Sequence, residues 1–205
     1  MYNAKNTKVN LLAAARELFA ERGYDNTSIR AITSLAQANL GAVTYHFESK
    51  ENLYREVFRA KAKPLLSRLM AIADGPGPPL ARIEMFARQF FEFLLDNREL
   101  PALLLHEIAL NRPVPEPIRA IMERLFGYLI AMIQQGQKEG SVVDGDPALL
   151  AISTFTQPAH VAILRQVLNA VFSLDLDRPD VRQATIDHVA DFMRRGLRAS
   201  GRQGL

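Results

Sequence analysis

The sequence predicts an all-α protein. Apolar residues recur at helical spacing along almost the whole chain, and no run alternates with a period of two over a length that would support a strand. The composition, 48% hydrophobic and 23% charged over 205 residues, is that of an ordinary globular chain and excludes global disorder. A chain of this length can bury a large core without the help of disulfides.

The first third of the chain predicts four helices. The apolar face of the first, about residues 8–22, consists of Leu11, Ala15, Leu18 and Phe19. Thr27 or Ser28 can cap a short second helix, and Asn39 can cap a third of about seven residues, 40–46. Ser49 is expected to cap a long fourth helix that ends near residue 73 and bends at Pro64.

A Gly/Pro-rich loop at residues 75–79 separates this part from the rest. Beyond the loop, apolar spacing and breaker residues predict helices at about 79–96, 99–111, 116–139, 147–171 and 179–199. Pro158 lies in the middle of the fourth of these and is expected to kink it. The prediction is therefore a nine-helix protein with two parts, residues 1–50 and residues 51–205.

The chain contains no cysteine, which excludes disulfides, Cys-ligated zinc and thiol nucleophiles. No histidine pair has the HExxH spacing of a zinc site, so we expect neither a metal nor another cofactor. No apolar stretch approaches the roughly 18 to 20 residues that cross a bilayer, and the first ten residues lack the apolar block of a signal peptide. A cytoplasmic protein without a membrane partner is expected.

Basic residues are concentrated in the first third, where residues 1–63 carry ten Lys and Arg against six Asp and Glu. Two short helices joined by a three-residue turn, behind a supporting helix in this basic part, predict a helix-turn-helix. Val43 and Phe47 should face the core, while small side chains at the start of the third helix let the backbone approach DNA bases. Tyr45, His46 and Lys50 are candidate phosphate donors. His46 has a second interpretation, as a helix-end histidine packed beside Phe47.

The run LLAAARELFAERGYDNTSIRAITSLAQANLGAVTYHFESKENLYREVF, about residues 8–60, resembles the DNA-binding domain of the tetracycline-repressor (TetR) family of bacterial regulators. The resemblance lies in A-x-x-L-F-x-x-x-G-Y, T-S-I-x-x-I and Y-H-F-x-S-K-E-x-L. Thr33 and Gln37 depart from it, since the family usually has alanine and glycine there. Gln37 in a left-handed turn would cost about 1 kcal/mol.

The resemblance implies two sets of DNA contacts. The residues that it places toward bases are Arg30, Leu40, Gly41, Ala42 and Thr44. Those that it places toward phosphates are Ser28, Tyr45, His46 and Lys50. Of the base-facing set, only Arg30 can make a bidentate bond to guanine.

For the C-terminal part the resemblance implies a helical ligand-binding and dimerisation domain. The candidate ligand-binding residues are Phe86, Phe90, Met122, Phe126, Phe155 and His160. The alternative for the aromatic residues is ordinary core packing. The broad apolar faces of helices eight and nine, residues 147–171 and 179–199, predict the interface of a homodimer, and burial within one subunit is the alternative.

The sequence thus predicts a transcription regulator, most plainly a repressor that a small hydrophobic ligand releases from a palindromic double-stranded operator. A DNA-binding regulator controlled by a protein partner is one alternative. An enzyme that uses the C-terminal cavity is another, but residues 75–205 contain no phosphate-binding glycine loop, G-x-S-x-G or HExxH motif. We therefore do not expect an enzyme.

Overall fold

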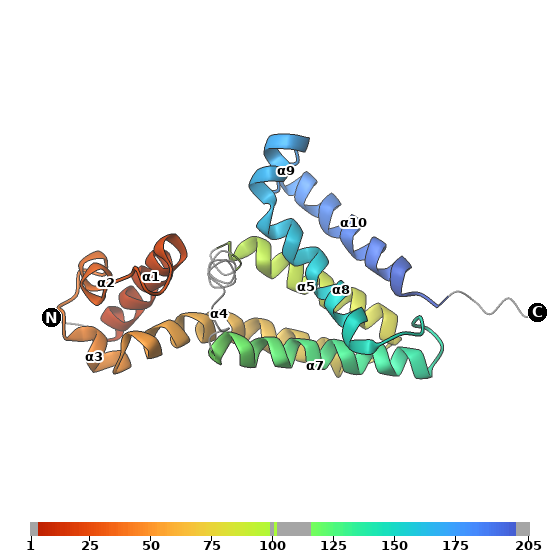
Figure 1. Ribbon diagram of the computed structural model, residues 1–205, viewed down its shortest axis with the longest axis horizontal. Helices are drawn as coiled ribbons and strands as arrows, with labels where there is room; N and C mark the ends of the chain where they lie inside the picture. The colour runs from red at the N-terminus through yellow and green to blue at the C-terminus, as the bar shows by residue number, and fades with distance from the viewer. Residues whose placement is uncertain (1–3, 99–100, 102–115, 200–205) are drawn as a thin grey trace, which may run out of the picture. The chain divides into compact units, whose positions relative to one another are not determined.

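The computed structural model describes residues 4–98, 101 and 116–199, and these residues form nine helices and no strand. They divide into two compact units, whose positions relative to one another are not determined (Figure 1). The first contains the helices up to Lys63 and the first turn of α7, and the second contains Pro64–Arg98 and the chain from Ile121 onwards. The predicted helix at 99–111 falls largely outside the described residues.

The helices of the first third are α1 (Ala4–Arg22), α2 (Ile29–Leu35), α3 (Ala42–Phe47) and α4 (Lys50–Ala73). The later helices are α5 (Pro79–Asp96), α7 (Glu116–Lys138), α8 (Pro147–Ile163), α9 (Arg165–Phe172) and α10 (Pro179–Leu197). The all-α prediction is confirmed, and most helix ends lie within a few residues of the expected positions. The exception is the predicted helix 147–171.

That predicted helix is two helices, since α8 ends at Ile163 and α9 leaves it at an angle of 65°. Pro158 lies inside α8, and the break falls at Leu164, six residues later. Asp177 accepts hydrogen bonds from Arg165, at 2.6 Å, and from Arg98, so the start of α9 is tied to the end of α5. The hydrogen bond from Arg165 holds the pKa of the Asp177 carboxyl below its ordinary value. Long-range ion pairs of this kind leave no signal in local periodicity.

The core of the second unit is formed where α5 packs against α8 and α10 (Figure 1). One face of α5 is buried along its whole length because apolar residues recur every three or four positions. The fully or almost fully buried residues on that face are Ile83, Phe86, Ala87, Phe90, Phe91 and Leu94. This helix therefore organises the packing of the second unit.

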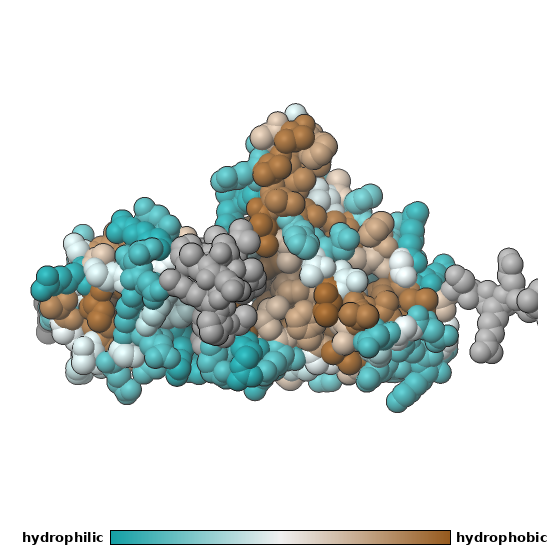
Figure 2. Space-filling model, viewed as in Figure 1, coloured by the Kyte–Doolittle hydropathy of each residue, from teal (hydrophilic) through white to brown (hydrophobic). Residues whose placement is uncertain are grey.

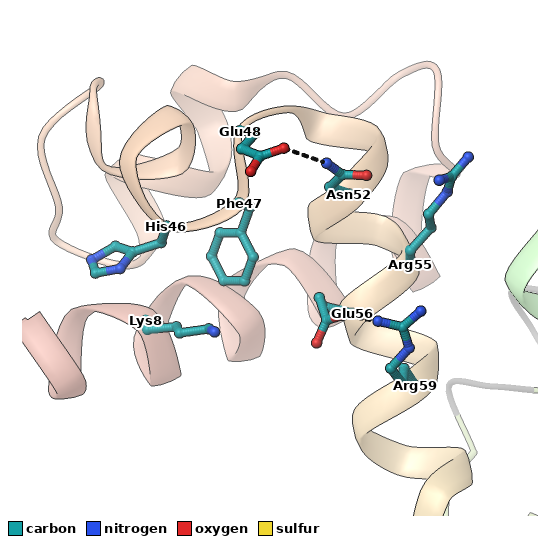
Figure 3. Close-up of a pocket in the computed structure, with 8 residues that line it drawn as sticks. All are labelled: Lys8, His46, Phe47, Glu48, Asn52, Arg55, Glu56 and Arg59. Carbon is teal, nitrogen blue, oxygen red and sulfur yellow. Dashed lines mark hydrogen bonds and ion pairs between the residues drawn. The ribbon is translucent and has the colours of Figure 1, made fainter.

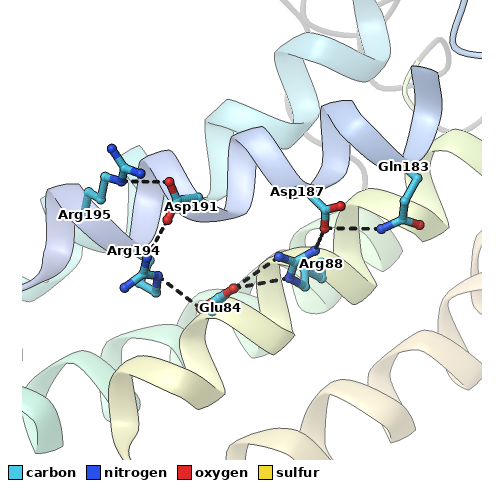
Figure 4. A network of polar contacts seen from close by, with 7 residues as sticks. All are labelled: Glu84, Arg88, Gln183, Asp187, Asp191, Arg194 and Arg195. Atoms are coloured by element: carbon cyan, nitrogen blue, oxygen red, sulfur yellow. Dashed lines mark hydrogen bonds and ion pairs between the residues drawn. The ribbon is translucent and has the colours of Figure 1, made fainter. Parts of the chain in front are cut away.

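A polar network joins the outer edges of α5 and α10 (Figure 4). Arg88 of α5 bonds Glu84 on its own helix and Asp187 on α10, and Glu84 also lies 3.6 Å from Arg194. The hydrogen bond from Arg88 keeps the pKa of the Asp187 carboxyl low. Exposed pairs of this type add little stability singly, so the network fixes the alignment of α10 more than it stabilises the fold.

Arg82 is the one charged side chain that is buried among the described residues, at 7% exposure. Its guanidinium donates to the backbone carbonyl of Ala73, the last residue of α4, and to the side-chain carbonyl of Gln135 on α7. The last carbonyls of a helix have no partner within the helix, and a cation there also meets the negative end of the helix dipole. Arg82 thus anchors the end of α4 to α5 and α7.

Apolar side chains are exposed on α9, which has no buried residue. Val167, Val171 and Phe172 are between 51% and 65% exposed, and Figure 2 shows hydrophobic surface over this helix at the top of the view. Across the part of the chain that the structure describes, no single helix is both long and apolar enough to span a membrane.

We predict that Arg82→Met lowers the free energy of unfolding by about 1–3 kcal/mol, because it leaves the partly buried carbonyl of Ala73 and the side-chain carbonyl of Gln135 without their donor. Thermal unfolding at one fixed protein concentration measures this as a fall in midpoint of about 2–4 °C per kcal/mol. Arg178→Met is the control, since Arg178 pairs with Asp180 in solvent. Equal midpoints for the two variants would show that Arg82 is not an anchor.

Candidate nucleic-acid interface

An aromatic cluster holds α1 against the first turns of α4. Phe19 on α1 meets the ring of Tyr54 edge to face at 5.0 Å between centroids, and Tyr54 meets Phe58 at the same distance. The predicted apolar face of α1 is confirmed, because Leu11, Ala15, Leu18 and Phe19 are all at most 5% exposed. Edge-to-face aromatic packing favours one relative orientation of two helices. The cluster therefore gives α2 and α3 a rigid support.

Two neighbouring hydroxyl groups place α2 on this support. Thr27 is fully buried, and its hydroxyl lies 3.0 Å from the carbonyl of Leu18 and 2.7 Å from that of Gly23, at the end of α1. Ser28 is the N-cap of α2, and its Oγ accepts from the amide of Ala31 at 3.1 Å. Of the two caps that the sequence allowed, Ser28 is the one formed.

The turn after α2 has the left-handed conformation that the sequence suggested for Gln37. Its φ is 52°, its amide donates to Ser34, and the next amide, of Ala38, donates to Thr33. This pair of bonds is a Schellman motif, whose left-handed position is usually glycine. The hydroxyl of Thr33 bonds the carbonyls of Ile29 and Arg30 within α2. Neither departure from the family pattern disrupts the turn.

The recognition helix of a helix-turn-helix corresponds to α3, which begins two residues later than expected. Its N-cap is Gly41, with no side-chain cap, so the prediction that Asn39 caps a helix over 40–46 was wrong. The amide of Ala42 instead donates to the backbone carbonyl of Asn39 in a tight turn. Val43 and Phe47 are 0% and 4% exposed, as expected for the side of α3 that faces the core.

Most of the residues expected to face bases are on the surface. Arg30, Gly41 and Thr44 are exposed, and Leu40 is 53% exposed. Ala42 is only 4% exposed and is buried with its neighbour Val43. Its methyl group is not available to a base, so the prediction of a contact from Ala42 is corrected.

The residues expected to face phosphates also lie near the surface. Ser28 is exposed with its hydroxyl used as a cap, and Tyr45 is 79% exposed. His46 is half-buried, and its ring meets Tyr45 edge to face at 4.8 Å and Phe47 at 6.2 Å. His46 thus packs beside Phe47 and is also partly accessible to solvent, so both interpretations of this residue remain compatible with the structure.

Lys50 stands at the first position of α4 with its ammonium 4.2 Å from the ring centre of Tyr24. Partial burial lowers the pKa of Lys50, and the charge of Asp25 acts in the opposite direction. The cation–π contact orients the side chain beside the helix start. Ser49 caps α4 as expected, because its Oγ accepts from the amide of Asn52 at 3.1 Å.

A polar groove of about 380 Å³ lies behind α3, between α1 and α4 (Figure 3). Its lining residues are Lys8, His46, Phe47, Glu48, Asn52, Arg55, Glu56 and Arg59. Of these, only His46 and Phe47 were predicted from the sequence to have a role in the helix-turn-helix. The others come from α1, from α4 and, for Glu48, from the joint between α3 and α4. Their mixed charges resemble an ordinary solvated surface, so no sequence signal distinguished them.

The candidate ligand-binding residues lie in the second unit and fall into two groups. Phe86, Phe90 and Phe155 are buried, and the partly buried Met122 and Phe126 pack against the same core. The ring of Phe155 is 4.3 Å from that of Phe90 and 4.8 Å from that of Phe126. His160 is exposed on α8 and is not part of this aromatic cluster. The buried positions fit both core packing and the wall of an apolar site.

These elements define a helix-turn-helix DNA-binding protein, and comparison with known proteins agrees. Residues 11–57 match the family model described as bacterial regulatory proteins, tetR family. The chain is 26% identical over 198 residues to the HTH-type transcriptional regulator RutR of Escherichia coli K12, covering 93% of this chain and 90% of RutR. It is 25% identical over 205 residues to the HTH-type transcriptional repressor NicS of Pseudomonas putida, covering 95% and 94%.

Among solved structures, a bacterial regulatory protein in the tetR family from Rhodococcus RHA1 superposes with a TM-score of 0.76 at 21% identity, covering 95% of this chain and 98% of that one. The family match, the relatives and the solved structures together support a TetR-family transcription regulator. The homologues and the fold support a DNA-binding regulator, and TetR-family regulators are not enzymes. Regulators of this family bind DNA operators and typically act as dimers with small-molecule effectors.

We predict that Gln37→Gly stabilises the protein by about 1 kcal/mol, because glycine adopts a positive φ without the steric cost. The midpoint of thermal unfolding should rise by about 2–4 °C. Ala36, one residue earlier, has φ −76°, so Ala36→Gly is the matched control and should lower the midpoint. A fall in the midpoint for both variants would refute the strain assigned to Gln37.

Proposed function

We propose that the chain is a homodimeric repressor that binds a palindromic operator and is released from it by a small apolar ligand. One observation supports the DNA-binding part most directly. The exposed face of α3 and the turn before it presents Leu40, Gly41 and Thr44, while Val43 and Phe47 anchor the same helix from behind. Arg30 on α2 adds a donor pair that fits guanine.

Contacts to DNA bases and contacts to DNA phosphates have different roles in this proposal. Leu40 offers apolar contact, most naturally to a thymine methyl group, and Thr44 offers one hydroxyl. Ser28, Tyr45, His46 and Lys50 would contact phosphates and set the register of the protein on the duplex. Because few side chains in the base-facing set form hydrogen bonds, sequence preference should depend partly on DNA shape.

The proposed dimer face lies on α8 and α10. All seventeen residues of α8 lack Asp, Glu, Lys and Arg, and Leu149 and Ile152 on this helix are 65% and 46% exposed. On α10, Phe192 is 58% exposed, whereas Asp187 and Arg194 face the network with α5. An uncharged helix with exposed apolar side chains, beside an exposed aromatic residue on a neighbouring helix, is typical of a subunit interface.

The extent of that face is narrower than the sequence suggested. Several residues of the expected interface are buried within the protomer, where they belong to the core of the second unit: Phe155, Ile186, Val189, Met193 and Leu197. For these positions the alternative, burial within one subunit, was the correct interpretation. The dimer proposal therefore rests on the exposed positions Leu149, Ile152 and Phe192.

The proposed effector site is the aromatic cluster around Phe155. Rings of Phe90 and Phe126 flank Phe155, and Phe86 and Met122 continue the apolar surroundings, so an occupant of this region would be mainly apolar. α4 is the proposed route from this site to DNA, because one helix carries Lys50 at its start and Ala73, anchored by Arg82, at its end. Linkage then requires that ligand and operator weaken each other by the same factor.

We predict opposite signatures for Lys50→Ala and Arg30→Ala in titrations with DNA from the region upstream of the chain's own gene. Lys50→Ala should weaken binding to all duplexes alike and reduce the magnitude of the salt slope by about one, because a phosphate contact is lost. Arg30→Ala should reduce discrimination against base changes at one symmetric pair of positions.

Matched and mismatched duplexes at several salt concentrations provide the measurement. An unchanged salt slope for Lys50→Ala would remove Lys50 from the phosphate-contact set. An Arg30→Ala variant that still discriminates at every position would remove Arg30 from the base-contact set.

We predict that Ile152→Asp yields a monomer at micromolar concentration in sedimentation equilibrium, because a charge buried at the interface without a partner costs several kcal/mol. Ile152 is exposed in the protomer, so helical content should be unchanged by circular dichroism. Met85→Asp changes a residue of α5 that is 50% exposed outside the proposed face, and it should leave the dimer intact. A dimeric Ile152→Asp variant would place the interface elsewhere.

A further inference from the structure

The joint between α3 and α4 contains a second left-handed residue, Glu48, which the sequence analysis did not single out. Its φ is 68° and its ψ is −40°. The amide of Ser49 donates to the carbonyl of Phe47 at 2.7 Å, which closes a three-residue turn around Glu48. This bond and these angles are close to those of the classic γ-turn, a rare and strained conformation for any residue with a side chain. Glycine would adopt it at lower cost.

The side chain of Glu48 reaches across the joint that its backbone forms. Its Oε2 accepts a hydrogen bond from the side-chain amide of Asn52 at 3.3 Å, and Figure 3 shows the carboxylate turned toward Asn52 in the first turn of α4. The backbone amide of Asn52 in turn donates to Ser49 Oγ. The turn and the start of α4 are thus connected by both backbone and side chains.

This joint sets the direction in which α3 leaves α4. Only Glu48 and Ser49 separate the two helices, and Phe47 at the end of α3 and Leu53 in the first turn of α4 are both buried. A turn with a single narrow backbone conformation leaves α3 little freedom to rotate. Base contacts require a side chain to be held at a fixed place, whereas phosphate contacts from flexible side chains tolerate small rotations.

The charge of Glu48 has a separate effect. Glu48 is exposed and stands two residues from both His46 and Lys50 in the chain, and those two residues belong to the proposed phosphate-facing set. A phosphate bound by Lys50 would lie within about one Debye length of this carboxylate at physiological salt, so the two negative charges repel. That repulsion acts on every duplex, whatever its sequence.

We propose that Glu48 is a positioning residue for sequence recognition: its strained γ-turn fixes the recognition helix on α4, and its carboxylate limits sequence-independent affinity for DNA. The inference rests on the proposed function of the helix-turn-helix. It explains why a strained non-glycine residue stands at a joint where glycine would be the less costly choice.

Two variants separate the backbone effect from the charge effect. Glu48→Gly removes both strain and side chain, and Glu48→Gln keeps the size and a carbonyl acceptor while it removes the charge. The measurements are the dissociation constants for an operator duplex and for a scrambled duplex of the same composition, together with the midpoint of thermal unfolding. Glu56→Gln is the control, because Glu56 lines the same groove but lies within α4, away from the joint.

For Glu48→Gly we expect a thermal midpoint at least as high as that of the unaltered protein, with an operator preference over scrambled DNA that falls at least about three-fold. For Glu48→Gln we expect the preference to be unchanged and both affinities to rise. At low ionic strength one carboxylate–phosphate pair about 8 Å apart in water corresponds to about two-fold, and two pairs in a dimer to about five-fold. Screening at physiological salt reduces the combined factor to about two-fold. Glu56→Gln should change both affinities less than Glu48→Gln.

A Glu48→Gly variant that keeps the full operator preference overturns the positioning role, and a lower midpoint overturns the strain. Unchanged affinities for Glu48→Gln overturn the role of the charge. An unaltered protein that binds no duplex selectively overturns both this inference and the proposed function. Selective binding by the unaltered protein, with full preference retained in Glu48→Gly, overturns this inference alone.

Discussion

The burial of Val43 and Phe47 is the interaction on which the DNA-reading surface depends. α3 has only six residues, and isolated helices shorter than about 12 residues are marginal in water. Its helical form and its direction therefore come from packing. Phe47 is 4% exposed, with the ammonium of Lys8 on α1 5.5 Å from its ring centre. The aromatic cluster between α1 and α4 makes this support rigid, so the exposed side of α3 keeps one orientation.

Two strained residues bracket the same short helix. Gln37 precedes α3 with φ 52°, and Glu48 follows it with φ 68°. At both positions glycine would fit the backbone more easily, yet each residue forms the hydrogen bonds that its turn requires. Strain that persists at both ends of a functional element indicates that the surrounding core determines the geometry and that local preference yields to it.

Local patterns were sufficient for much of the fold. The buried face of α1 around Leu11 and Phe19 was predicted from helical spacing. The left-handed conformation of Gln37 was predicted because the family usually has glycine at this position. The prediction failed where contacts between residues far apart in the sequence determine the structure. The start of α9, just after the break at Leu164, pairs with Asp177 twelve residues further on, and the anchor at Arg82 depends on the ends of two other helices. Neither has a local signal.

Within the candidate interface, the sequence located the helix-turn-helix but not the start of its second helix. The helix starts at Ala42 and not at residue 40, and the methyl group of Ala42, expected to face a base, is buried. The end of a helix is determined by a few competing hydrogen bonds, here the bond from the amide of Ala42 to the carbonyl of Asn39. Hydrophobic periodicity does not predict which of these bonds forms. The strained turn at Glu48 was missed for the same reason.

Selection of bound sequences from random duplex DNA tests the central claim most directly, because it uses the unaltered protein and assumes no operator. The account predicts enrichment of a palindrome whose two half-sites are centred about one helical turn apart, about 34–36 Å, so that both recognition helices of a dimer reach the major groove. Enrichment of a single unrepeated site, or no enrichment above the starting pool, would contradict it.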